Sequence, residues 1–212
     1  MWYLDEINTV RSEDSKKAVK KYEEYFSVMA LNVEQIRKRI LFARELEDAL
    51  FMLFLAWLYG ADEQAAQDEF VERYMYTVEQ FDDVGLEFDF VEYIVLLAAS
   101  LYESTMRNID DPYYTSFDRA TYVAANEANT ALNKIEYTQA VKGGMTKKTW
   151  HTEQDLRVRH THVPMDGKTI PIDGVFDVGG VKMKYPKDYS TDAANASLLR
   201  ETANCRCAVS YE

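Results

Sequence analysis

Two histidines and two cysteines give this sequence its clearest capacity for chemistry. His160 and His162 stand two positions apart, and so do Cys205 and Cys207, the two cysteines of the 212-residue chain. Alternate side chains of a β-strand point to the same face, so each pair would present both side chains together if it lay on a strand. Two imidazoles and two thiolates are the ligand set of a closed tetrahedral zinc site. The sequence thus raises a structural zinc site as a hypothesis and indicates no other cofactor.

The same four residues have a simpler interpretation as packing groups. One residue separates the members of each pair, whereas zinc ligand pairs are usually separated by two to four, and buried cysteine often behaves as a small apolar residue. We favour packing over zinc, and over a metal-dependent hydrolase that would use these residues with a nearby carboxylate as base. No phosphate-binding loop, nucleophile elbow or His-Glu-x-x-His helix is found in the sequence. We therefore expect no enzymatic activity.

Charged residues surround the pair of histidines. If this stretch is helical, Asp155 and Arg159 are four residues apart and Arg159 and His162 three apart, so all three share one side of the helix. They would form either a site for an anion or protein partner, or an ion-paired network that braces a small core. We favour bracing, because Asp155 supplies a countercharge nearby. Arginine, with its planar fork of donors, suits such a role better than lysine.

The elements that must position these residues change character near Lys142. Residues 1–140 hold 13 Lys+Arg against 27 Asp+Glu, whereas 141–212 hold 11 against 9 together with six of the eight glycines and all three histidines. The first part has the composition of helices and the second that of short strands and turns. We predict an α+β protein: a mainly α-helical N-terminal domain, 1–142, and a small mixed α+β module, 143–212.

Apolar spacing predicts four helices in the first part. One runs from about Val33 to Gly60, a second follows Asp62, a third spans 86–106 and a fourth begins near Ser116 and ends at Gly143-Gly144. The third shows little polar surface, so we expect it to be central. In the second part, Gly179-Gly180 predicts a tight turn between strands.

Composition also excludes several classes of protein. The longest uncharged run, Ala49 to Ala61, is too short for a membrane span, which needs about 20 residues. A formal net charge of −12 argues against strong nucleic-acid binding, which depends on Lys and Arg. Two cysteines and no signal-peptide pattern indicate a protein made in a cytoplasm.

An ordered series of motifs runs through the last third of the chain. It consists of Lys148-x-Trp150, an Asp-x-Arg-x-Arg-x-x-His from Asp155 to His162, Asp166-Gly167, Phe176, Tyr185-Pro186, and Asn204-Cys-Arg-Cys207. This order resembles the phage Mu F-like minor head proteins, also called the head morphogenesis family. The resemblance covers about 117–209, because Arg119, Asn126 and Asn129 are similar to the family's Arg- and Asn-bearing helix, although Arg119-Ala-Thr departs from the more usual Arg-Thr-Glu.

The resemblance implies structural work in a virus particle. Such proteins look like low-copy components that enter the head with the portal, bind portal or capsid subunits and in some cases influence how DNA leaves. We would place this chain in the virion, in the capsid interior or at the portal vertex. Related modules also occur as carriers ahead of toxin domains, which is an alternative. The family brings no established active site, so we expect a structural network made of Trp150, Asp155, Arg157, Arg159, His162, Asp166, Gly167, Asn204 and Arg206.

Overall fold

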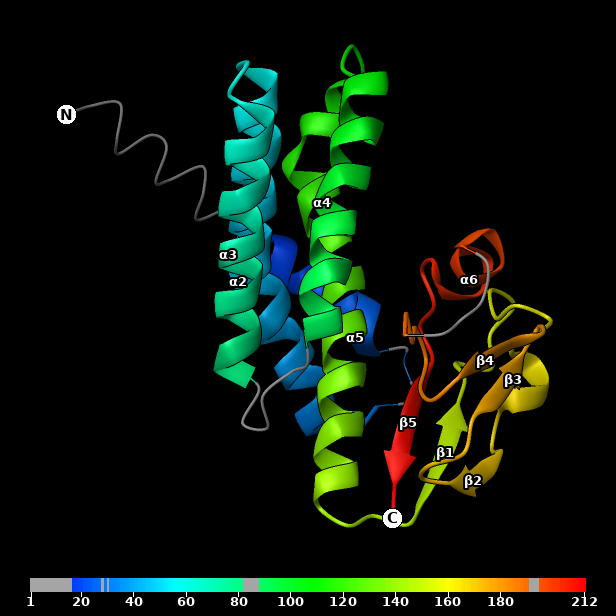
Figure 1. The fold of residues 1–212 in the computed structure, drawn as a ribbon. Coiled ribbons are helices and arrows are strands. Elements are labelled where there is room, and N and C mark those ends of the chain that lie inside the picture. Colours follow the sequence, from blue (N-terminus) through cyan, green and yellow to red (C-terminus); the bar gives the residue numbers. More distant parts are fainter. Residues whose placement is uncertain (1–16, 28, 30, 82–87, 191–194) are drawn as a thin grey trace.

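The fold is given by a computed structural model, which describes residues 17–27, 29, 31–81, 88–190 and 195–212. After a helical segment at 17–27, the main helices are α2 (Val33–Leu58), α3 (Glu63–Phe81), α4 (Phe88–Arg107) and α5 (Phe117–Lys142), with a short 3-10 turn, η1 (Pro112–Thr115), before α5. Figure 1 shows these four helices standing side by side. The four helices predicted from apolar spacing are confirmed to within a few residues.

Local chemistry explains where the helices begin and end. Asn32 caps α2 by accepting the Gln35 N–H at 2.9 Å, and Ser116 caps α5 by accepting the Arg119 N–H at 3.1 Å. Asp62 does the same before α3, with the N–H of Ala65 at 2.9 Å. At the other end of α5, Gly144 adopts a left-handed φ of +75°, which glycine tolerates and other residues rarely do.

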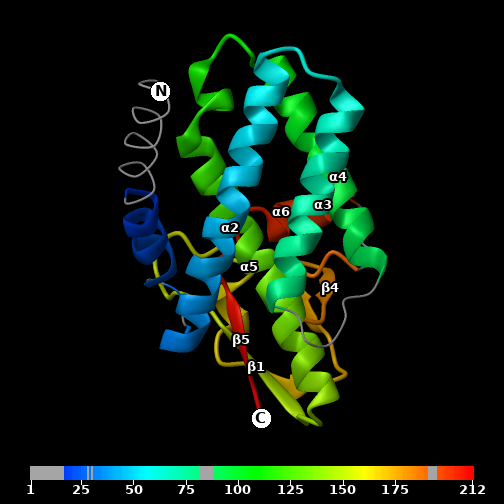
Figure 2. The same ribbon diagram turned by 90° about the vertical axis from the view of Figure 1, so that its left-hand side faces the viewer.

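The central helix is α5, and the expectation that the third helix would be central is wrong. α4 leaves Val95 47% and Leu96 63% exposed. α5 instead lies against α2 on one side and against the C-terminal strand on the other. Its alanine-rich face allows close approach to α2, because alanines at 120, 124, 128 and 131 are fully buried there. Figure 2 shows α2 and α3 in front of α5, with the strands behind it.

The strands and a short helix make up the rest of the chain. β1 (Lys147–His151) is the middle of an antiparallel three-stranded sheet in the order β2-β1-β5, with β2 at Thr169–Pro171 and β5 at Ala208–Tyr211. β3 (Phe176–Val178) and β4 (Val181–Met183) form a separate hairpin; a 3-10 turn, η2 (Val163–Met165), and α6 (Asn195–Thr202) complete the set. The predicted α+β class is confirmed. The predicted turn is also confirmed, with Gly179 and Gly180 at φ +60° and +87°.

The buried apolar side chains form two hydrophobic clusters. One is made by the helices and includes residues from Ala18 to Ile135. The other is made by the strands and α6, and Trp150 and Phe176 are its largest side chains. The rings of these two meet edge to face, with centroids 5.0 Å apart. None of the described helices is long and apolar enough to cross a membrane.

A buried polar seam joins the two clusters along α5. The guanidinium of Arg39 on α2 is fully buried and donates to Asn129 Oδ1 and Asn133 Oδ1, each at 3.0 Å, and to Glu136 at 2.7 Å. The amide groups of the same two asparagines donate onward to the main-chain carbonyls of Cys205 and Pro186, at 3.0 and 3.1 Å. The seam therefore fixes the position of the cysteine segment relative to the helices.

Candidate functional site

The cysteines lie in an extended segment between α6 and β5, and not on a strand as the zinc hypothesis assumed. Asn204 adopts a left-handed φ of +53°, which asparagine tolerates better than most residues, and reverses the chain after α6. The N–H of Cys205 then donates to the carbonyl of Thr202 at 3.1 Å. Both cysteine side chains are buried, with 2% and 4% of each residue exposed.

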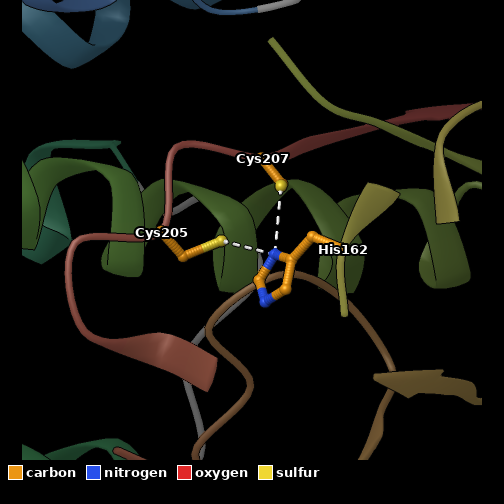
Figure 3. A group of neighbouring side chains, drawn as sticks. All are labelled: His162, Cys205 and Cys207. Carbon is orange, nitrogen blue, oxygen red and sulfur yellow. Dashed lines mark hydrogen bonds between the residues drawn. The ribbon is translucent and has the colours of Figure 1, made fainter. Parts of the chain in front are cut away.

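His162 reaches the cysteines from a different segment. It lies in a turn, and its N–H donates to the carbonyl of Arg159 at 2.9 Å. Its Nδ1 lies 3.4 Å from Sγ of Cys207 and 3.7 Å from Sγ of Cys205. Figure 3 shows the imidazole pointing toward both sulfurs. One ligand atom from each of the three residues falls within 4.8 Å of the others, which makes a group able to hold a metal ion.

A carboxylate lies behind the imidazole. Oε2 of Glu201, on α6, is 3.3 Å from Nε2 of His162 and accepts a hydrogen bond from the Thr161 hydroxyl at 2.6 Å. Burial disfavours ionisation of Glu201, but hydrogen bonds from Thr161 and Arg200 hold its pKa below the usual value. A negative charge beside Nε2 favours the tautomer that carries its proton there, which leaves Nδ1 free to face the sulfurs.

The two thiols are coupled. A hydrogen bond from Cys207 lowers the pKa of Cys205 well below its usual value, against the effect of burial and with further help from His162. The same hydrogen bond, together with burial, raises the pKa of Cys207. The pair thus favours one thiolate and one thiol, and a thiolate beside an imidazole can either bind a metal or act as a nucleophile.

The remaining predicted network residues are brought around this centre by contacts between distant segments. Arg206 pairs with Asp155 at 3.0 Å and also contacts the carboxylate of Glu153. Arg159 donates to the carbonyl of Ala203. The ring of Trp150 meets that of His162 edge to face, with centroids 5.9 Å apart. Asp166 accepts the N–H of Thr152 at 2.7 Å, a bond that lowers its pKa, and Gly167 donates to the carbonyl of Trp150 at 2.8 Å.

Two expectations about this region do not hold. Residues 155–162 form no helix, because the chain passes through turns after Gln154, whose φ is +54°. Asp155 therefore pairs with Arg206 and not with Arg159, and Arg157 is exposed. His160 also lies in the turn, is exposed, and does not join the metal-capable group of His162 and the two cysteines.

Sequence reasoning missed several residues that shape the site. Glu153 and Glu201 flank the cluster, yet neither has a local pattern that distinguishes it from an ordinary surface glutamate. Lys187 is fully buried, donates to Asn126 Oδ1 at 2.6 Å, and has a pKa lowered by burial to about 8. Lys148, which the motif series already includes, is equally buried; its Nζ lies 4.7 Å from the Tyr137 ring centroid and burial lowers its pKa to about 8.

The fold and site together define a class of structural module. Its distant segments are held together by hydrogen bonds and ion pairs around a buried His-Cys-Cys cluster, and hydrogen bonds from α5 join it to the helices. The family described as "Phage Mu protein F like protein" matches residues 98–210, and the chain belongs to this family. The resemblance drawn from the ordered motifs is thereby confirmed. Membership makes the chain a bacteriophage head morphogenesis protein, and the family is a structural one found in the virion.

One curated relative is an NAD(+)--arginine ADP-ribosyltransferase, named EFV, from Enterococcus faecalis. It is 28% identical over 116 residues, which are 53% of this chain but 22% of that protein. The chain therefore spans about a fifth of the relative's length. No solved structure matches the chain.

Proposed function

We propose that this protein is a low-copy minor head component that binds portal or capsid subunits while the phage head assembles. It works by binding and not by catalysis. Family membership supports a role in the head, and the surface of the helical body supports the mode of binding. In the virion it would occupy the capsid interior or the portal vertex, where it would also influence genome ejection.

The observation that carries the proposal is the exposed acidic face of α3. Asp68, Glu69, Glu72 and Glu79 are all exposed, while Phe70, Tyr74 and Val78 on the opposite side of the helix are buried. Such a face attracts a basic protein surface and repels DNA phosphates. A protein that must stay near packaged DNA without being trapped by it benefits from both effects.

Charge reversal on α3 tests this proposal. The triple variant Asp68→Lys, Glu72→Lys, Glu79→Lys leaves Glu69 in place, because Glu69 pairs with Arg73 at 2.8 Å. We expect co-sedimentation with portal assemblies or capsid subunits of the same phage to fall about tenfold or more for the triple variant, as expected when several complementary charges are lost. A control with the same charge change at exposed sites elsewhere, Glu23→Lys, Glu45→Lys, Glu103→Lys, should bind like wild type. Equal loss of binding in both variants would contradict a specific role for α3.

The closed geometry of the cysteine cluster supports binding over hydrolysis. His162, Cys205 and Cys207 are at most 4% exposed, and the cavity among them measures about 20 Å³. That volume holds about one water molecule and no substrate. A metal-dependent hydrolase needs an open coordination position that its substrate can reach.

A second candidate function is favoured by the similarity to the transferase from Enterococcus faecalis. The matched stretch is a small part of that protein, so this chain would correspond to a module that accompanies a toxin and not to the whole enzyme. Incubation of the purified chain with labelled NAD and an arginine-containing acceptor tests whether the chain itself has transferase activity. We expect no transfer of ADP-ribose. Transfer above the level of a heat-denatured sample would overturn the proposal that the chain lacks enzymatic activity.

A further inference from the structure

We propose that the buried cluster binds one zinc ion, held by Nδ1 of His162 and by the thiolates of Cys205 and Cys207, with the carboxylate of Glu153 as the fourth ligand. The proposal stands on the geometry of these side chains and is independent of the function proposed above. The ion would be structural, closing the C-terminal module.

The spacing of the ligand atoms matches a tetrahedral zinc site. Zinc binds sulfur at about 2.3 Å and imidazole nitrogen at about 2.05 Å, so a tetrahedral angle places the nitrogen about 3.6 Å from each sulfur. The observed distances from Nδ1 of His162 are 3.4 Å to Cys207 and 3.7 Å to Cys205. Ordinary packing of a histidine against two cysteines does not require both contacts to be made by the same ring nitrogen.

A buried carboxylate beside the group of three would supply the fourth ligand. The side chain of Glu153 is 2% exposed; its Oε2 contacts the Arg206 guanidinium, and within the described residues its Oε1 has no hydrogen-bond partner. It lines the same small cavity as His162 and the two cysteines. Its oxygens lie outside the group of ligand atoms that fall within 4.8 Å of one another, so the side chain would turn toward the ion on binding. Arg206 lies at the outer side of Glu153.

Glu201 fits the role of an orienting group. Metal-bound histidines usually place their second ring nitrogen against a carboxylate or carbonyl, which fixes the tautomer and raises the basicity of the ligating nitrogen. Glu201 Oε2 lies 3.3 Å from Nε2 of His162, on the side of the ring away from the sulfurs; the contact does not have hydrogen-bond geometry, and a small turn of the ring would give it that geometry.

The charges are compatible with an ion at this place. A zinc ion and two thiolates sum to zero, and Arg206 lies against both Glu153 and Asp155 on the outer side. The ion binds both cysteines as thiolates, so the proton of the one remaining thiol is released to solvent and no oxidant or other reactant is required. Four protein ligands leave no open position, as expected for a structural and not a catalytic site.

The ion would join three segments that are far apart in sequence: the loop after β1, the turn containing His162, and the segment between α6 and β5. Small modules often need such a link, because they bury too little apolar surface to be stable without one. Folding of this module would then be coupled to metal binding.

Metal analysis of the full-length chain tests the proposal. Protein produced with zinc in the medium and purified without chelator should contain about one zinc per chain. Cys205→Ser, Cys207→Ser and His162→Ala should each lose the metal, whereas His160→Ala, at the exposed neighbouring histidine, should keep it. Glu153→Gln and Glu201→Gln should weaken zinc affinity about 10- to 100-fold. An affinity unchanged in Glu153→Gln would overturn the assignment of the fourth ligand.

A cobalt titration keeps the test valid if the cysteine variants fail to fold. Wild-type protein stripped of metal is titrated with Co²⁺ while circular dichroism follows the helices. We expect the ultraviolet thiolate-to-cobalt absorption band to saturate at one equivalent, and Zn²⁺ to displace it. Zinc should also protect both cysteines from a thiol reagent. Folded wild-type protein that takes up neither metal, or that carries a stoichiometric metal other than zinc, would overturn the proposal.

Discussion

The side-chain amide of Asn129 donates a hydrogen bond to the main-chain carbonyl of Cys205, 3.0 Å away and 76 residues further along the chain. The same amide accepts from Nε of Arg39, also at 3.0 Å. One fully buried asparagine on α5 therefore links α2 to the cysteine segment. The position of the cluster depends on the helical body through this contact.

Asn129→Ala should destabilise the protein by about 2 kcal/mol, because it removes one partner each from a buried carbonyl and a buried guanidinium. Urea unfolding followed by circular dichroism measures the loss. Asn108→Ala is the control, since the amide of Asn108 donates to the Ser104 carbonyl one turn earlier in the chain. Equal urea midpoints for the two variants would contradict the prediction that the Asn129 contacts contribute more to stability than a local hydrogen bond does.

Arg39→Lys should cost about 3 kcal/mol of unfolding free energy, even though the charge is kept. A lysine ammonium cannot span Asn129, Asn133 and Glu136 as the guanidinium does, so part of the buried network loses its donors. Arg37→Lys, an exposed position on the same helix, should have no measurable effect on the denaturation curve. An Arg39→Lys protein as stable as wild type would contradict the prediction, because a lysine would then satisfy the same buried groups.

Gly179→Ala and Gly180→Ala form a matched pair at the tip of the β3–β4 hairpin. Both residues have left-handed φ, so either substitution adds backbone strain of about 1 kcal/mol. A Cβ on Gly179 would also lie 2.7 Å from Oε1 of Glu201 and 2.9 Å from Cγ2 of Thr161, whereas a Cβ on Gly180 meets nothing within 4 Å. We expect Gly179→Ala to lower the melting temperature clearly more than Gly180→Ala. Equal shifts would mean that Glu201 moves aside without cost.

Stability should fall between about pH 4.5 and pH 7 through Glu47. This glutamate on α2 is buried, and burial raises its pKa from 4.5 to about 7, against the opposing effect of the hydrogen bond from the Tyr22 hydroxyl. A carboxyl with a raised folded-state pKa holds its proton more tightly in the native protein. Its contribution is therefore full below pH 4.5 and is lost as the pH rises to 7, by at most about 3 kcal/mol.

Glu47→Gln isolates this effect, because glutamine can still accept from Tyr22 but does not titrate. The difference in unfolding free energy between the variant and wild type should favour the variant more at pH 8 than at pH 5. Urea unfolding at both pH values measures it. Glu45→Gln, at an exposed position of the same helix, serves as the control. The same pH dependence in wild type and Glu47→Gln would contradict the prediction.

The helices could be predicted because their signals are local. Three- and four-residue apolar spacing, capping residues such as Asp62 and Ser116, and the glycines after α5 all act within a few positions. The α+β class and the β3–β4 turn followed from the same kind of information. Local information could not show that α5 and not α4 is the central helix. The contacts that place α5 at the centre are made with residues about 50 to 100 positions away.

The arrangement around the cysteines could be predicted only in outline. The motif order indicated that Asp155, Arg206 and His162 belong together, but the arrangement considered for a helical 155–162 does not apply, because this stretch consists of turns. Nothing in the local sequence marks Glu153 and Glu201, whose roles arise when three distant segments meet. The zinc hypothesis used His160 and His162 alike, although the motif series includes only His162; in the structure the turn buries the ring of His162 and exposes that of His160.

α5 packs its alanines against the helices, whereas the amide groups of Asn129 and Asn133 and the ring of Tyr137 contact the C-terminal segments; the rings of Tyr137 and Tyr185 lie 5.1 Å apart. The composition changes after Lys142, but a fragment that begins there would lack α5, the helix against which β5 packs. A fragment that keeps these contacts must therefore begin upstream of α5. The family match, which starts at residue 98, does so.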